Sequence, residues 1–140
     1  HGYFTLESLD WLVAGGRVPK AAASISAVLD MKADLTYDLD GSLTLTGVSR
    51  GRKKALKGLV KKFKELYRGD VEHMIGIVDA DDAEAAGAVE EMVRAELGDA
   101  CPSIQRFTLD PTIGGHVGPG MVALAFWGTD RAQDARASKR

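Results

Sequence analysis

The fold class of this chain is decided by two apolar stretches, MIGIV at residues 74–78 and MVALAFW at residues 121–127. Neither stretch alternates polar and apolar side chains, which predicts strands whose two faces are both covered. Between them, an amphipathic segment starting at Asp81 or Asp82 and ending near Gly98 predicts a helix, and Ile104–Leu109 predicts another strand. This strand–helix–strand order is typical of an α/β domain with crossover connections.

Upstream of this unit, two alternating stretches predict a β-hairpin. They cover Ala33–Asp38 and Ser42–Ser49, and Leu39-Asp40-Gly41 joins them. An Asp-Gly pair between alternating strands is a strong hairpin signal. We therefore expect a two-layer α/β sandwich. Its mixed sheet would have about five strands, from an N-terminal hairpin plus a βαβ unit, with helices packed mainly on one face.

The expected helices are few. The clearest spans Arg52–Arg68, where apolar residues recur at helical spacing. A shorter one runs through Leu6 to Val13, with Thr5 as its cap and Gly15-Gly16 as its stop, and another lies within Ala21–Leu29. Four helices, two of them short, are too few to cover both faces of the sheet. We expect a missing domain or an apolar ligand to cover part of the second face.

The composition sets limits on function. The chain has 140 residues, 45% of them hydrophobic and 27% charged, with a net charge of −2, which fits one globular domain. This balance gives no electrostatic case for nucleic acid or an anionic membrane, and no run of roughly 18 to 20 apolar residues predicts a membrane span. The single cysteine, Cys101, forms no internal disulfide and suits a reducing cytoplasm. The chain begins without methionine, as expected of a segment cut from a longer protein.

The most unusual segment is the glycine-rich stretch Ile113–Gly120, for which we expect a loop over Gly114–Gly120. Glycine lets a backbone approach a ligand closely, so its N–H groups are candidates to cradle an anion, with His116 as a further donor. The alternative is a tight turn whose histidine only faces solvent.

Two further candidate sites are basic. Val13–Lys20 places Arg17 in a constrained loop, suited to a carboxylate or phosphate. Residues 50–68 hold nine of the 18 lysines and arginines, and Arg50 and Arg52 lie where the expected helix begins. Cations there oppose the helix dipole, which favours an anion-docking site. The alternatives are a solvated arginine and a solvated helix face.

Other chemistries lack a motif in this sequence. Asp79, Asp81 and Asp82 do not follow the calcium-loop pattern and are explained by helix capping, and the histidines and Cys101 lack zinc-ligand spacing. No nucleophile elbow, phosphate-binding loop or dinucleotide fingerprint is present. We therefore expect no catalytic residue, no metal and no cofactor.

Taken in order, several segments resemble the C-terminal domain of the DegV family. The resemblance extends from about residue 3 to residue 128, and residues 129–140 would form a polar, frayed tail. The final motif is the most specific, because a histidine inside a Gly-Pro-Gly loop before an apolar strand is rare. The matching segments are Tyr3–Leu9, Gly15–Val18, Leu29–Lys32, Asp40-Gly41, Val48–Leu56 and Ile113–Gly120.

This resemblance implies a two-domain carrier that encloses one long-chain fatty acid and is not itself an enzyme. His116, with Gly115 and Gly118 of its loop, would bind the carboxylate together with Thr and Ser side chains of an N-terminal domain that this chain lacks. Some family members present the fatty acid to a kinase that makes acyl-phosphate. Arg17, Arg50 and Arg52 would then face the kinase or the acyl-phosphate.

Two other functions remain open from the residues. One is a phosphate- or nucleotide-binding enzyme domain that uses the Gly114–Gly120 loop and the basic helix start. The other is a protein-interaction or nucleic-acid module that uses the basic helix face. The acidic overall balance and the lack of aromatic residues among the lysines argue against nucleic acid.

Overall fold

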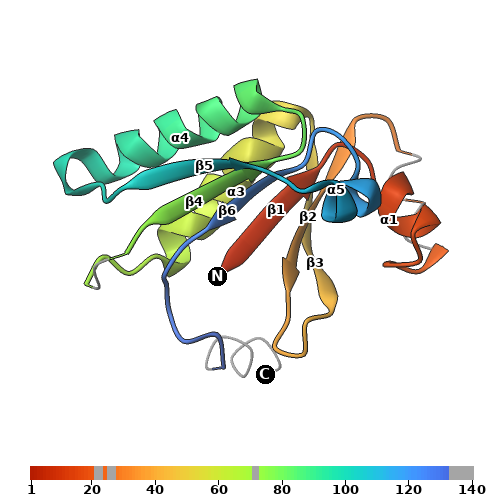
Figure 1. The fold of residues 1–140 in the computed structure, drawn as a ribbon, viewed down its shortest axis with the longest axis horizontal. Helices are drawn as coiled ribbons and strands as arrows, with labels where there is room; N and C mark the ends of the chain where they lie inside the picture. Colours follow the sequence, from red (N-terminus) through yellow and green to blue (C-terminus); the bar gives the residue numbers. More distant parts are fainter. Residues whose placement is uncertain (21–23, 25–27, 71–72, 133–140) are drawn as a thin grey trace.

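The computed structural model describes residues 1–20, 24, 28–70 and 73–132. A six-stranded mixed sheet forms its centre, with strand order β3-β2-β1-β6-β4-β5 (Figure 1). The strands are β1 (Gly2–Leu6), β2 (Met31–Tyr37), β3 (Leu43–Arg50), β4 (Ile75–Asp79), β5 (Ile104–Thr108) and β6 (Val122–Ala125). The helices are α1 (Asp10–Ala14), α3 (Arg52–Leu66), α4 (Ala83–Leu97) and α5 (Pro111–Val117), with a 3-10 turn at Gly98–Ala100.

Both predicted supersecondary units are present. β2 and β3 form the antiparallel hairpin, and Gly41 in its turn has φ +89°, a conformation that glycine adopts without steric cost. β4, α4 and β5 form the βαβ unit, with β4 and β5 parallel from Ile75 beside Ile104 to Asp79 beside Thr108. β6 runs antiparallel to both β4 and β1 and so connects the two units into one sheet.

The sheet has one strand more than predicted, because the expected helix wrongly begins at Leu6 with Thr5 as its cap and no strand is predicted before it. Residues 2–6 form β1, which pairs with β2 on one side and β6 on the other. Phe4, Thr5 and Leu6 are at most 4% exposed, and the Thr5 hydroxyl donates to Ala33 O instead of capping a helix. The helix begins only at Asp10. Pairing with two strands satisfies the β1 backbone on both sides, which a short helix at a chain end does not achieve.

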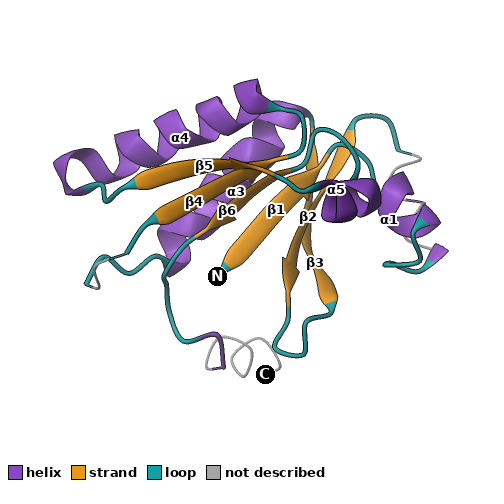
Figure 2. Cartoon of the chain, in the orientation of Figure 1, coloured by secondary structure: helices purple, strands orange, loops and turns teal. Residues whose placement is uncertain are grey.

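One face of the sheet is covered by α3 and α4 (Figure 2). The predicted apolar stripe of α3 is confirmed: Leu56, Leu59, Val60 and Phe63 are all buried against the sheet. The inner face of α4 adds Val89 and Val93 to the same cluster. This cluster is the larger of the two cores.

The second face is covered only in part. α1 and α5 lie over the β1–β2 end, where Phe4, Leu6, Leu12 and Val117 form a second buried cluster. Over β4, β5 and β6 no described helix covers the same face, so the predicted cover on both faces of residues 74–78 and 121–127 is not supplied by the described part of the chain. The expectation of a partly uncovered second face is confirmed. Three large apolar side chains are exposed there: Met74 (48%), Phe107 (42%) and Trp127 (58%).

Two predicted segments lie wholly or partly outside the described residues. The helix expected within Ala21–Leu29 falls mostly there, as does the tail from residue 133 onward. At the described start of that tail, Thr129 N donates to Leu66 O at 2.8 Å. Within the described part of the chain, no helix is long and apolar enough to cross a bilayer.

Candidate functional site

His116 lies in the last turn of the short helix α5. Asp110 begins this helix: its carboxylate accepts from the backbone N–H groups of Thr112 at 2.8 Å and Ile113 at 3.2 Å. The predicted loop over Gly114–Gly120 is therefore wrong for Gly114–Val117, which are helical. A cap and a proline at the helix start outweigh the low helix propensity of two glycines in this short element. Only Gly118–Gly120 form the turn into β6.

The helical path also occupies backbone groups that were expected to cradle an anion. Gly114 N donates to Asp110 O, and Gly118 N donates to Gly114 O, both at 2.9 Å. Gly115 is exposed on the helix. The N–H group of Gly118 is therefore already used within the helix and does not contribute to a cradle for an anion. His116 is left as the principal polar side chain of the motif.

Two glycines allow α5 to dock against α1. A Cβ atom on Gly15 would lie 2.7 Å from His116 Nδ1, and a Cβ atom on Gly118 would lie 2.2 Å from Trp11 Cδ1. Gly118 also has φ +75° and ψ 172°, a region open essentially to glycine alone. The glycines of both motifs thus permit close packing of the two short helices.

This docking brings together the two motifs that the sequence singled out. Arg17 Nη2 lies 3.5 Å from His116 Nε2, across 99 residues of chain. The guanidinium can only donate, so Nε2 accepts in this contact. An anionic oxygen placed between the two side chains would accept from Arg17 and, once Nε2 carries a proton, from His116 as well. The pair is therefore a candidate site for one anionic group.

Arg52 occupies a different environment from the one expected. Its Nη2 donates to Asp82 Oδ2 at 2.6 Å and to Gly120 O at 2.5 Å, and its Nε lies 3.9 Å from Glu7 Oε2. These acidic partners explain how a cation is tolerated at the start of α3. The hydrogen bond to Gly120 O also fixes Arg52 to the turn that follows α5. Arg50, at the end of β3, is exposed.

The sequence analysis did not predict the acidic residues that pair with Lys32 and Arg52. Lys32 is only 7% exposed, and its ammonium pairs with Glu7 and, at 3.4 Å, with Asp30. Glu7 thus lies between Lys32 and Arg52. The only signal in the sequence was the unfavourable position of Arg52 against the helix dipole, which calls for a nearby acid.

The expected aspartate capping is confirmed. Asp82 is the N-cap of α4, and its carboxylate accepts from Ala85 N at 3.1 Å. Asp79 Oδ1 accepts from Asp82 N at 3.0 Å. Among the described residues, no cluster of three or more His, Cys, Asp or Glu side chains is arranged to hold a metal ion.

An open apolar hollow of about 400 Å³ lies over β4, β5 and β6. It lies on the sheet face that also carries α1 and α5, because side chains two residues apart on a strand share a face. On β6, Ala123 packs against the cluster beneath α5, and Ala125, two residues on, lines the hollow. The apolar surface therefore extends from the end of the sheet beneath α5 to the hollow over β4, β5 and β6. Its lining includes Met74, Gly76, Val78, Phe107, Ala125 and Trp127.

Comparison with known proteins gives consistent matches. A family model described as "Uncharacterised protein, DegV family" matches residues 1–128. A DegV domain-containing protein of Clostridium perfringens is 34% identical over 126 residues, which cover 90% of this chain and 43% of that protein. The chain thus spans less than half the length of such relatives.

Solved structures share the fold. A fatty acid binding DegV family protein from Streptococcus agalactiae matches with a TM-score of 0.73 and 29% identity, covering 88% of this chain and 42% of that one. The Streptococcus pneumoniae fatty acid kinase (Fak) B3 protein, solved with linoleic acid, matches with a TM-score of 0.80 and 19% identity. That match covers 91% of this chain and 44% of the other chain.

Proposed function

Because the chain belongs to the DegV family, we propose that it is part of a non-catalytic carrier that binds one long-chain fatty acid. The observation that carries the proposal is that the His116–Arg17 contact and an open apolar surface share one face of the sheet. His116, beside Arg17, would hold the carboxylate. The fatty acid binding ability named for the Streptococcus agalactiae protein, at 29% identity, supports the same ligand class.

A fatty acid has a charged head and an apolar tail, which suits a sheet face with a polar end and an apolar hollow. Each buried CH₂ group contributes about 0.8 kcal/mol, so contacts of the tail with the hollow would supply most of the affinity. A carboxylate taken out of water must be hydrogen-bonded, so the polar end would set the orientation of the ligand. The exposure of Phe107 and Trp127 leaves apolar surface available for such a tail.

The site would be completed by a part of the protein that lies outside this chain. The relatives are more than twice as long as the matched region. In our proposal, their remaining N-terminal domain supplies Thr and Ser donors to the carboxylate and closes the hollow into a tunnel. This chain alone would then bind fatty acid weakly.

A finer part of the proposal concerns a partner enzyme. A fatty-acid kinase would transfer a phosphoryl group from ATP to the bound carboxylate, giving acyl-phosphate and ADP. Arg17, Arg50 and Arg52 would face the kinase or the acyl-phosphate. Arg17 and Arg50 are exposed and available for such a contact, whereas Arg52 would act from its position beside Gly120.

The alternative phosphate- or nucleotide-binding enzyme domain has weaker support. The N-terminus of α5 is already occupied by the Asp110 carboxylate, which repels a second anion. At the start of α3, the Arg52 guanidinium is paired with Asp82. Neither helix start therefore offers the free, positive N-terminus that a phosphate favours.

Isothermal titration with palmitate tests the proposal. We expect the longer parent protein to bind at least tenfold more tightly than this chain, and equal affinities would refute the shared site. In the longer protein, His116→Ala should weaken binding at least tenfold, because it removes a donor to a desolvated carboxylate. Thr112→Ala, an exposed change on the same helix, serves as the matched control and should leave the affinity unchanged.

A further inference from the structure

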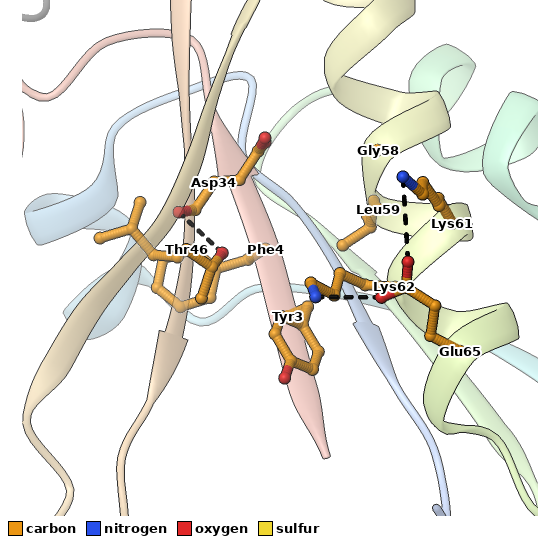
Figure 3. A pocket seen from close by; sticks show the side chains of 10 residues that line it. Tyr3, Phe4, Asp34, Thr46, Gly58, Leu59, Lys61, Lys62 and Glu65 are labelled. Atoms are coloured by element: carbon orange, nitrogen blue, oxygen red, sulfur yellow. Dashed lines mark hydrogen bonds and ion pairs between the residues drawn. The ribbon is translucent and has the colours of Figure 1, made fainter. Parts of the chain in front are cut away.

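Arg52 differs from the later cations of α3 in the groups that it contacts. Lys61 Nζ and Lys62 Nζ lie 3.9 Å and 3.0 Å from carboxylate oxygens of Glu65, on the same helix. Figure 3 shows both pairs beside the ribbon of α3. Exposed pairs of this kind contribute little to a fold. Arg52 instead donates to groups on two other parts of the chain, so its contacts connect separate elements.

The Arg52 side chain links the start of α3 to the end of the turn that follows α5. Its Nη2 donates to Gly120 O at 2.5 Å and to Asp82 Oδ2 at 2.6 Å, and 23% of the side chain is exposed. Asp82 is itself fixed, because its other carboxylate oxygen caps α4. Hydrogen bonds from a charged donor are the stronger class. The Gly120 carbonyl is therefore held by a group whose own position is fixed.

The other side of Gly120 is held as well. Its N–H donates at 2.7 Å to Ala80 O, directly after β4. A Cβ atom on Gly120 would lie 3.0 Å from Glu7 Cβ, so the turn also packs closely on the segment after β1. The end of the turn is thus fixed by Ala80 through its N–H and by Arg52 through its carbonyl.

His116 precedes this fixed point by only four residues. Its imidazole packs on α1: a Cβ atom on Gly15 would lie 2.7 Å from Nδ1 and 3.6 Å from Cε1. On the other side of the ring, Nε2 lies 3.5 Å from Arg17 Nη2. Contacts this close tolerate little displacement of α5. A shift of the turn at Gly120 would therefore change the distance between His116 and Arg17.

We propose that Arg52 is a positioning residue for the fatty-acid head group, acting through His116 without contacting the ligand. The inference rests on the proposed function for its ligand, and it specifies how Arg52 would act from its position beside Gly120. The Nη2 group of Arg52 is already engaged by Asp82 and Gly120, whereas Arg17 is exposed. Arg17 and His116 would bind the carboxylate, and Arg52 would keep the turn behind them in place.

The positional part is tested in this chain without ligand, by the nuclear Overhauser effect between the Gly15 Hα protons and the His116 ring. Arg52→Met should reduce this effect at least twofold, whereas Arg52→Lys, which keeps a cationic donor, should retain most of it. Arg52→Gln replaces Arg52→Met if that variant does not fold. Val93→Ala, a cavity in the fully buried core between α3 and α4, lowers stability elsewhere and should keep the full effect. A wild-type effect in the Arg52 variant, or an equal loss in Val93→Ala, overturns the proposal.

The functional part is tested by palmitate titration of the longer parent protein, in a double-mutant cycle with His116→Ala. Arg52→Met alone should weaken binding at least fivefold, and its addition to His116→Ala should weaken binding less than twofold further. Lys53→Met, an exposed change one residue later, is the matched control and should bind as the wild type does. Additive losses would show that Arg52 contacts the ligand itself and would overturn the proposal. If His116→Ala alone has no effect, the proposed function fails, and the Overhauser measurement still decides whether Arg52 positions His116.

Discussion

The sheet buries one face under the long helices α3 and α4, whereas in the described part of the chain α1 and α5 cover the other face over β1 and β2 and leave the rest open. The first face carries the larger core, in which Phe63 is fully buried. The second carries the His116–Arg17 contact, and beside it the exposed side chains of Phe107 and Trp127. The difference indicates that the helical face sustains the fold, while in our proposal the half-covered face binds the ligand.

The largest expected effect is a difference in the free energy of unfolding between substitutions on the two faces. Phe63→Ala on the helical face should lower the free energy of unfolding by about 3–5 kcal/mol. Its ring is fully buried and meets Phe126 edge-on, with centroids 5.0 Å apart. Trp127→Ala on the open face should change that energy by only about 0.5 kcal/mol, as for other surface positions. Urea unfolding of both variants measures the difference, and similar losses would remove the distinction between the faces.

The next effect concerns the covered end of the second face. Gly118→Ala should cost about 2–4 kcal/mol, because it adds backbone strain to a clash with the Trp11 ring. Gly115→Ala is the control: no atom lies within 4 Å of its new Cβ, so it should be neutral or stabilise by up to about 1 kcal/mol. Thermal unfolding compares the two. A tolerated Gly118→Ala would show that α1 and α5 are not closely docked.

The hydrogen bonds and ion pairs of Arg52 should contribute less to the free energy of unfolding. Arg52→Met should lower stability by about 1–3 kcal/mol, since it leaves Asp82 Oδ2 and Gly120 O without the Arg52 donor. Lys53→Met, an exposed change one residue later, should be within about 0.5 kcal/mol of wild type. Denaturant unfolding provides the measurement. If Arg52→Met matched Lys53→Met, the network would be only a surface feature.

The smallest effect is a pH dependence at Asp34. Its folded-state pKa is raised above the unfolded value by burial, so the folded protein binds the proton more tightly. Stability contributed by this group is therefore present below the unfolded pKa of about 3.9 and is lost as pH rises through the higher folded pKa. Asp34→Asn should accordingly be more stable than wild type at pH 7, and this advantage should shrink near pH 3.5. Melting temperatures at both pH values test this, and a pH-independent difference would contradict it.

The elements predicted correctly from sequence are those fixed by local signals. The Asp40-Gly41 turn determines the hairpin, and the apolar stripe of residues 56–63 determines α3. β1 was missed because Leu6, Leu9 and Leu12 satisfy helical spacing while the strand depends on partners about 30 and 120 residues away. Such pairing leaves no local signature.

The candidate site was predicted in its parts and not in its geometry. The motifs singled out His116 and Arg17, but their contact depends on how α1 and α5 dock. The Lys32–Glu7–Arg52 network joins three separate segments, and the β2–β3 register shifts between Asp34 and Leu35. Charge and spacing along a chain do not encode contacts of this kind, because tertiary packing creates them.

In our proposal, one face of the sheet holds a fatty acid with its head near His116 and its tail in the open hollow. Doxyl-labelled stearates test it in a ¹⁵N spectrum of this chain, at concentrations below micelle formation. A label at carbon 5 should broaden the amide signals of Gly15, Arg17 and His116 first. A label at carbon 16 should broaden those of Gly76, Phe107 and Trp127. Identical broadening by both labels, or broadening confined to the exposed lysine face of α3, would contradict the account.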